Sequence, residues 1–218
     1  MTTLNTPPLA PLLDDLFTKA AAATTPALAT MDADERTRLL HSKTEYSDFY
    51  SRLKDLWLPV SRGTGTLLYM LTSSTHARSV VEFGTSFGLS TLHMAAALKD
   101  NGGGKLITTE FEPSKVARSR EHFEAAGLGG LIEIREGDAL QTLAVNLPSA
   151  IDLLLLDGAK ALYTDVLRLV EPHLKPGALI VADNADFTPD YLPYVRAADN
   201  GYLSLPFASD IELSMRLG

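Results

Sequence analysis

The sequence contains no cysteine among its 218 residues. Disulfide bonds and thiolate metal sites are therefore excluded, and nothing points to an oxidising compartment. No apolar run approaches the roughly 20 residues that a membrane-spanning helix needs. The first residues also lack a basic segment followed by an apolar run, so we expect no secretory signal peptide. These absences predict a cytoplasmic protein with no membrane partner.

Positive charge is also scarce. Lysine and arginine together number 19 against 27 aspartates and glutamates, which gives a net charge of −8 with neutral histidines. An acidic surface argues against nucleic acid as a main partner. The apolar fraction of 45% is typical of a globular protein with a substantial core, and the length suits one domain. We therefore expect residues 1–218 to form a single domain.

Short apolar runs alternate with amphipathic stretches after Ser79. Such alternation predicts βαβ units and a doubly wound, Rossmann-like α/β sheet. The apolar runs cover residues 79–83, 105–110, 131–136, 150–157 and 178–183, and the helical patterns cover 89–99, 113–126, 139–146 and 160–172. Two further runs, at 202–207 and 211–217, are separated by only three residues. That gap is too short for a parallel crossover, so they predict an antiparallel hairpin at the sheet edge.

The N-terminal part has a different pattern. We expect residues 1–60 to form a helical cap and residues 61–218 to form the core. The cap should contain a helix at 12–23 within loosely held chain, a helix that begins at Asp32 with acids in its first turn, and a helix over 43–57 that ends before Pro59. Gly63 and Gly65 predict a loop before a further helix at 66–73.

A glycine-containing turn, Glu82 to Ser90, follows the first strand. Gly84 allows a sharp turn, and Gly88 allows the next helix to approach the sheet closely. Ser86 stands where the dinucleotide fingerprint has its middle glycine, which disfavours an NAD oxidoreductase.

Acids follow the next two strands. In doubly wound sheets the ligand lies beyond the carboxyl ends of the strands. Glu110 ends the second strand and can accept hydrogen bonds from ribose hydroxyls, while Asp138 follows the third and can bond an adenine amine. With the glycine turn, these acids predict a nucleoside site. The alternative is an ordinary strand-helix connection with solvated acids.

A second polar cluster follows the fourth and fifth strands. Asp157 ends one strand, and Asp183 and Asn184 end its expected neighbour. Two carboxylates and an amide suit a hard cation such as Mg²⁺. Lys160 can point into the same site and act as a base, with Tyr163 nearby. The alternative is that the two aspartates only cap the following helices.

These motifs resemble those of the cation-dependent class I O-methyltransferases, the group of catechol O-methyltransferase and the caffeoyl-CoA O-methyltransferases. The turn from Glu82 to Ser90 is similar to the motif E-x-G-T/A-x-x-G-x-S. Asp157, Lys160 and Tyr163 match D-x-x-K-x-x-Y, and the pair at 183–184 matches D-N. The similarity spans residue 62 to the end. Gly158 departs from the pattern, because catechol O-methyltransferase has histidine there.

The resemblance implies a seven-stranded sheet with an antiparallel last strand, flanked by helices. It also implies that S-adenosylmethionine lies over Gly84, that Mg²⁺ or another divalent cation is bound, and that a loop at 60–66 closes over both ligands. The implied cofactor-binding residues are Glu82, Gly84, Thr85, Ser86, Gly88, Ser90, Glu110, Asp138, Ala139 and Asp157. The implied metal ligands are Asp157, Asp183 and Asn184, and the implied catalytic base is Lys160.

The activity implied is methyl transfer to an oxygen of a small hydroxylated substrate, catechol-like or a vicinal diol. Tyr46, Tyr50 and Trp57 are candidates for an aromatic substrate wall, although such spacing also fits core packing. Two alternatives stay open: a metal-independent N- or C-methyltransferase on the same core, and a non-catalytic nucleoside-binding protein. A homodimer is also left open, because relatives of this family are often dimers.

Overall fold

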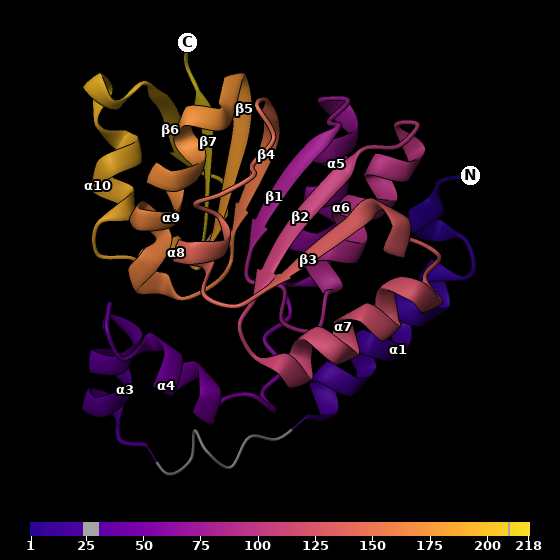
Figure 1. The fold of residues 1–218 in the computed structure, drawn as a ribbon, viewed down its shortest axis with the longest axis horizontal. Coiled ribbons are helices and arrows are strands. Elements are labelled where there is room, and N and C mark those ends of the chain that lie inside the picture. Colours follow the sequence, from indigo (N-terminus) through magenta and orange to yellow (C-terminus); the bar gives the residue numbers. More distant parts are fainter. Residues whose placement is uncertain (24–30, 209) are drawn as a thin grey trace.

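A single seven-stranded sheet organises the protein in the computed structural model, which describes residues 1–23, 31–208 and 210–218 (Figure 1). The strands are β1 Ser79–Phe83, β2 Lys105–Glu110, β3 Ile132–Glu136, β4 Ile151–Leu156, β5 Leu174–Asp183, β6 Tyr202–Pro206 and β7 Ile211–Arg216. They lie in the order β3-β2-β1-β4-β5-β7-β6. Strands β1 to β5 pair in parallel, and β7 runs antiparallel to both β5 and β6. The predicted sheet and its terminal hairpin are confirmed.

The strand order reverses direction between β1 and β4. Chain segments after β1 continue outward to β2 and β3, whereas β4 begins the opposite half. Phe83 pairs with Thr109 on one side and with Leu156 on the other. Ligands bind at such switch points, beyond the carboxyl ends of the strands. The topology therefore brings the glycine turn and the second polar cluster to the same crevice.

Helices cover both faces of the sheet, so its central strands β1 and β4 are buried along their whole length. They are α1 Leu9–Ala22, α3 Ala33–Leu40, α4 Tyr46–Arg52, α5 Arg62–Ser74, α6 Leu89–Asp100, α7 Pro113–Ala125, α8 Ala139–Thr142, α9 Tyr163–Val170 and α10 Tyr191–Arg196. Short 3₁₀ turns occupy 3–5, 129–131, 160–162, 171–173, 185–187 and 198–200. Helices α1, α5, α6 and α7 share one core cluster with the sheet, and α8, α9 and α10 share the other. None of these helices is long and apolar enough to cross a membrane.

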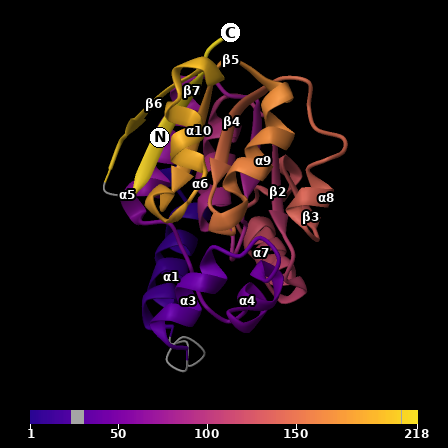
Figure 2. The ribbon, with the colours of Figure 1, turned by 90° about the vertical axis from the view of Figure 1, so that its left-hand side faces the viewer.

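Helices α3 and α4 lie apart from both layers. Figures 1 and 2 place them beyond the carboxyl ends of the parallel strands. Asp32 caps α3 by accepting a hydrogen bond from the Glu35 amide, as its sequence predicts. Leu39, Phe49 and Leu53 form a small cluster of their own between the two helices.

The predicted loop at Gly63 and Gly65 is wrong, because both glycines lie inside α5. Ser61 caps this helix by accepting a hydrogen bond from the Thr64 amide at 2.9 Å. A Cβ atom at Gly65 would come within 2.7 Å of the His93 ring on α6. Gly65 therefore reflects a close helix-helix contact, and the loop expected to close over the site at 60–66 is mostly the first turn of a helix.

Two other expectations for the N-terminal part need correction. Helix α4 covers only Tyr46–Arg52 rather than 43–57, since no side chain caps it and turns replace the helix after Arg52. The first residues are not loosely held, because the Thr3 amide donates to Asp100 Oδ2 at 2.9 Å. Residues 24–30, the other part of that expectation, lie outside the described residues.

The contact at Gly65 gives a stability test. Gly65→Ala should lower the free energy of unfolding by about 1–3 kcal/mol, because the buried His93 ring is held by its bond to the Leu89 carbonyl and has little room to move. Gly63→Ala is the matched control. Its Cβ would meet only Ser61 Oγ at 3.6 Å, so better helix propensity should leave stability unchanged or raise it by up to about 1 kcal/mol. Denaturant unfolding measures both, and equal effects would contradict the packing role of Gly65.

Candidate functional site

A cavity of about 1180 Å³ lies at the crevice beyond the carboxyl ends of the strands. The strand ends form its floor, and α4 with the segment between α4 and α5 forms its opposite wall. The cavity joins the two polar clusters that the sequence predicts, because residues from both contribute to one continuous lining.

The turn after β1 is shaped by residues with positive φ. Gly84 has φ 105°, and a Cβ atom there would lie 2.5 Å from the Asp157 carbonyl oxygen. At Gly88 a Cβ atom would overlap the Phe123 ring. Ser86 also has positive φ, at 48°, and its buried Oγ has no hydrogen-bond partner in the described structure. The turn therefore buries an unpartnered hydroxyl within a residue that lines the cavity.

Glu110 lines the cavity next to this turn. Its carboxylate accepts hydrogen bonds from the backbone amides of Ser86 at 2.9 Å, Phe111 at 3.0 Å and Glu112 at 3.0 Å. Burial raises the pKa of Glu110, and the nearby ammonium of Lys115 opposes this shift. Because a carboxylate offers about four acceptor positions, three amides fix its orientation and leave capacity for a ligand.

Three residues of the predicted cofactor set, Glu82, Thr85 and Ser90, support the turn through buried hydrogen bonds. Glu82 is fully buried, and its carboxylate accepts hydrogen bonds from Ser90 Oγ and Thr91 Oγ1, both at 2.5 Å. Thr85 Oγ1 bonds to Thr108 Oγ1 at 2.6 Å. Burial raises the pKa of Glu82 to about 7. These contacts tie the start of α6 to β1 and hold the turn in place.

Asp138 lies at the far end of the same wall, between Gly137 and Ala139, which also line the cavity. Its Oδ1 accepts from the Leu140 amide at 2.9 Å and caps α8. Its Oδ2 accepts from the hydroxyl of Tyr46 at 2.8 Å. Helix α4 therefore reaches the predicted nucleoside wall directly.

The second cluster forms the adjoining wall. Asp157, Asp183 and Asn184 line the cavity together with Lys160. Burial and the facing Asp157 carboxylate raise the pKa of Asp183 to about 7, and burial also raises the pKa of Asp157. Asn184 adopts a left-handed conformation, φ 52° and ψ 44°, which turns the chain sharply after β5.

Lys160 is held by three partners. Its Nζ lies 2.7 Å from Tyr163 Oη, 3.2 Å from the Asp183 carbonyl oxygen and 3.3 Å from Asp157 Oδ1. Tyr163 is fully buried, and its hydroxyl donates to the Asp183 carbonyl at 2.8 Å. The tyrosine oxygen can therefore accept from the lysine, and the amine is fixed at the cavity wall.

The donor set fits a hard divalent cation. Two facing carboxylates and an amide oxygen offer the ligands that Mg²⁺ prefers, and Mg²⁺ commonly binds through one or two carboxylates with water or substrate completing its shell. Within residues 1–23, 31–208 and 210–218, no group of three or more His, Cys, Asp or Glu side chains is placed to hold a metal. The predicted set differs from such a group because its third member is an amide.

Sequence reasoning missed one charged residue of the cavity lining, Lys115. Lys115, in the first turn of α7, lies near Glu110 and 5.6 Å from the centre of the Phe87 ring. Its position in the sequence, five residues after Glu110, was the one signal that could have placed it near this site. The three aromatic residues left open, Tyr46, Tyr50 and Trp57, all line the cavity. Trp57 also stacks on Phe87 with ring centres 4.1 Å apart.

Comparison with known proteins shows what this arrangement is similar to. Residues 81–185 match a family model described as a methyltransferase domain. It is 35% identical to a catechol O-methyltransferase of Niastella koreensis over 130 residues, 58% of each chain. It is 31% identical to catechol O-methyltransferase B of Danio rerio over 173 residues, 76% of this chain and 64% of that protein.

A solved structure extends the likeness of the methyltransferase domain to the whole fold. The O-methyltransferase from Bacillus cereus in complex with SAH matches with a TM-score of 0.70 at 21% identity, over 95% of this chain and 91% of that chain. These findings confirm the resemblance to catechol O-methyltransferases. The chain spans less than two thirds of the length of the curated relatives named above.

The buried Glu82 in this domain predicts a pH dependence of stability. Its pKa is raised in the folded state, so its stabilising contribution is fully present below about pH 4.5 and is lost as pH rises through about 7. Glu82→Gln should reduce this downward slope, which for one group reaches at most about 1.4 kcal/mol per pH unit. Denaturant unfolding in EDTA between pH 4.5 and 7.5 measures it, with the exposed Glu124→Gln as control. An unchanged slope in Glu82→Gln would contradict the assignment.

Proposed function

We propose that this chain is an S-adenosylmethionine-dependent O-methyltransferase that uses a divalent cation and acts on a small hydroxylated substrate, catechol-like or a vicinal diol. One observation carries the proposal: a nucleoside-type wall and a carboxylate-amide-lysine wall line the same cavity and meet where Gly84 lies against Asp157. A methyl donor on one wall would then face an activated hydroxyl on the other. The methyltransferase family match and the catechol O-methyltransferase relatives support this reading.

The first wall would bind S-adenosylmethionine. Glu110, already oriented by three amides, would accept hydrogen bonds from the ribose hydroxyls, and Asp138 would accept one from the adenine amine. Gly84 would let the backbone approach the ligand, and Ser86 would line the site beside it. Thr85, Ser90 and Glu82 would act by holding this turn.

The second wall would hold the cation through Asp157, Asp183 and Asn184. Bound there, a cation would lower the pKa of a substrate hydroxyl, as metals do for bound water. Lys160 would then remove the proton, because its amine is fixed at the cavity wall by Tyr163 and the Asp183 carbonyl. The acceptor oxygen forms a bond to the methyl carbon as the carbon-sulfur bond breaks. Catalysis would come mainly from positioning and electrostatics.

The lining of the cavity bears on the acceptor. Among the described residues that line it, five are acidic and three are basic: Glu110, Asp138, Asp157, Asp183 and Asp210 against Arg36, Lys115 and Lys160. The exposed apolar side chains of Leu58, Phe187 and Phe207 line it too. A cavity of this character favours an uncharged aromatic acceptor over a polyanion such as a coenzyme A ester.

The organisation of the chain follows from the same proposal. Residues 61–218 would form the catalytic core and residues 1–60 the cap, within one domain. A homodimer, which the resemblance leaves open, is a further proposal that sedimentation of the purified chain tests.

Removal of the cation or of its first ligand should abolish turnover. In assays with catechol, S-adenosylmethionine and Mg²⁺, both EDTA and Asp157→Ala should lower the rate by at least about 100-fold. Calorimetry should show cofactor binding largely intact in both cases. Asp165→Ala is the matched control. It removes a carboxylate of α9 that pairs with Lys43, and the variant should stay active. Full activity of Asp157→Ala in EDTA would contradict the cation's role and favour a metal-independent N-methyltransferase, which amine acceptors would then reveal.

Loss of the lysine amine should affect chemistry rather than binding. Lys160→Met should reduce kcat about 100- to 10,000-fold, the usual contribution of a general base, because no other fixed amine lies beside Asp157 in the described cavity lining. The dissociation constant of S-adenosylmethionine should change little. Steady-state kinetics and calorimetry separate the two effects. A Lys160→Met enzyme with unchanged kcat would exclude this base.

A further inference from the structure

We propose that Tyr46 of the N-terminal cap is a positioning residue of the cofactor site, holding the Asp138 carboxylate in the orientation that receives the adenine amine. The inference rests on the proposed function, since it assumes that Asp138 faces an adenine. It assigns to α4 a part in binding the methyl donor, in addition to covering the substrate side of the cavity.

The hydrogen bonds of Asp138 carry the argument. The Leu140 amide donates to Oδ1 at 2.9 Å, and the Tyr46 hydroxyl donates to Oδ2 at 2.8 Å. One donor on each oxygen fixes the carboxylate against rotation about its last bond. Each oxygen keeps further acceptor capacity, because a carboxylate accepts about four hydrogen bonds. An amine donor from the cavity can therefore bind to an Asp138 carboxylate that is already oriented.

Tyr46 is built into the wall rather than resting on the surface. Its ring packs against the same core cluster as Tyr50, and both rings line the cavity. Burial and the bond to Asp138 raise the pKa of Tyr46, so its hydroxyl stays protonated and remains a donor at neutral pH. Phe49, three residues further along α4, packs in the cap cluster with Leu39 and Leu53.

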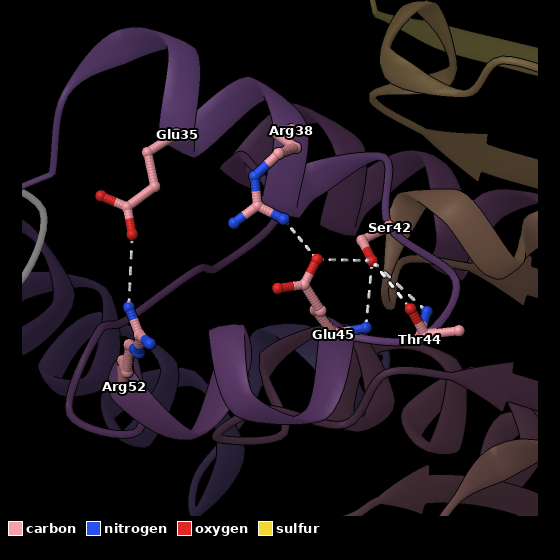
Figure 3. Close-up of polar contacts among 6 residues, drawn as sticks. All are labelled: Glu35, Arg38, Ser42, Thr44, Glu45 and Arg52. Atoms are coloured by element: carbon pink, nitrogen blue, oxygen red, sulfur yellow. Dashed lines mark hydrogen bonds and ion pairs between the residues drawn. The ribbon is translucent and has the colours of Figure 1, made fainter.

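The cap itself sets the position of Tyr46. Figure 3 shows the turn between α3 and α4, where Ser42 Oγ accepts from the Glu45 amide at 3.0 Å and the Glu45 carboxylate pairs with Arg38. Arg52, at the end of α4, lies 3.5 Å from Glu35 on α3. These contacts fix the residue immediately before Tyr46 and tie the two helices together. The orientation of Asp138 therefore depends on a segment 92 residues away in the sequence.

The turn between α3 and α4 also contacts the core through two exposed polar side chains, Lys43 and His41. Lys43 Nζ lies 2.7 Å from Asp165 Oδ2 on α9, and His41 Nε2 lies 3.1 Å from the Phe187 carbonyl oxygen. Both contacts are exposed, and exposed ion pairs contribute little to stability. The Tyr46–Asp138 bond differs from these two contacts because both of its residues line the cavity.

A purely structural tie and a positioning role differ in one measurable way. If the Tyr46–Asp138 bond only stabilises the fold, its loss should weaken the binding of every ligand of the site equally. If it positions Asp138, its loss should weaken only the binding of ligands that carry the exocyclic amine. The probes are therefore S-adenosylhomocysteine and its hypoxanthine analogue, in which a carbonyl oxygen replaces that amine. Calorimetry gives the dissociation constant of each with the full-length protein.

Tyr46→Phe should weaken S-adenosylhomocysteine binding about 10-fold, since the bond to a charged acceptor is lost, and should change binding of the hypoxanthine analogue less than about 2-fold. Asp138→Asn should likewise reduce discrimination between the two ligands, and the double variant should add little to either single variant. Tyr69→Phe is the matched control. Tyr69 Oη makes the same kind of bond to Asp100 Oδ2, at 2.7 Å, away from the cavity, so binding of both ligands should be unchanged.

The outcomes separate this inference from the proposed function. An equal loss for both ligands in Tyr46→Phe, or no loss for either, overturns the positioning role while leaving the methyltransferase proposal intact. A wild-type protein that binds neither S-adenosylhomocysteine nor S-adenosylmethionine overturns the proposed function, and the inference with it. Thermal unfolding of each variant, compared with wild type, shows whether a binding loss reflects a folding defect.

Discussion

The backbone of Gly84 lies against the carbonyl of Asp157, and the two walls of the cavity meet at this contact. It exists because β1 and β4 are neighbours at the point where the strand order reverses, and the Asp157 amide donates to the Phe83 carbonyl at 2.9 Å. Any side chain at position 84 would have to displace the end of β4. The separation of the proposed nucleoside wall from the carboxylate wall is thus fixed by the main chain, and side chains only complete each wall.

Buried negative charge is concentrated around this contact. Glu82 and Asp183 both have pKa values raised to about 7, and the pKa values of Glu110 and Asp157 are also raised, chiefly by burial. Backbone amides at Glu110 and the ammonium groups of Lys115 and Lys160 offset part of the free-energy cost of burying these carboxylates. Such groupings are typical of functional sites, because stability alone does not favour burying carboxylates together. A bound cation and a sulfonium donor would both be attracted to this charge.

The sequence predicts the sheet well because the strands are apolar runs bounded by turn residues, and the pattern of each is local. The acids at strand ends are also predictable, since topology alone brings them to one edge. The inward orientation of Glu82 could not be predicted from its strand alone, because it depends on the hydroxyls of Ser90 and Thr91, which lie on the next helix. Gly65 reads as a loop signal until the His93 ring against it is seen. The contact of Tyr46 with Asp138 joins distant segments, so no local pattern indicates it.

Two separate requirements can favour the same residue type at position 184: the backbone conformation there and the side-chain oxygen that the proposed cation site needs. The position has a left-handed conformation, which glycine, asparagine and aspartate accept most readily. Glycine would supply no oxygen to the cavity. Aspartate would add a third carboxylate beside Asp183, whose pKa is already raised by burial and by the Asp157 carboxylate. Asparagine turns the chain and offers a neutral oxygen, so the identity of this residue is set as much by the bend after β5 as by what it faces.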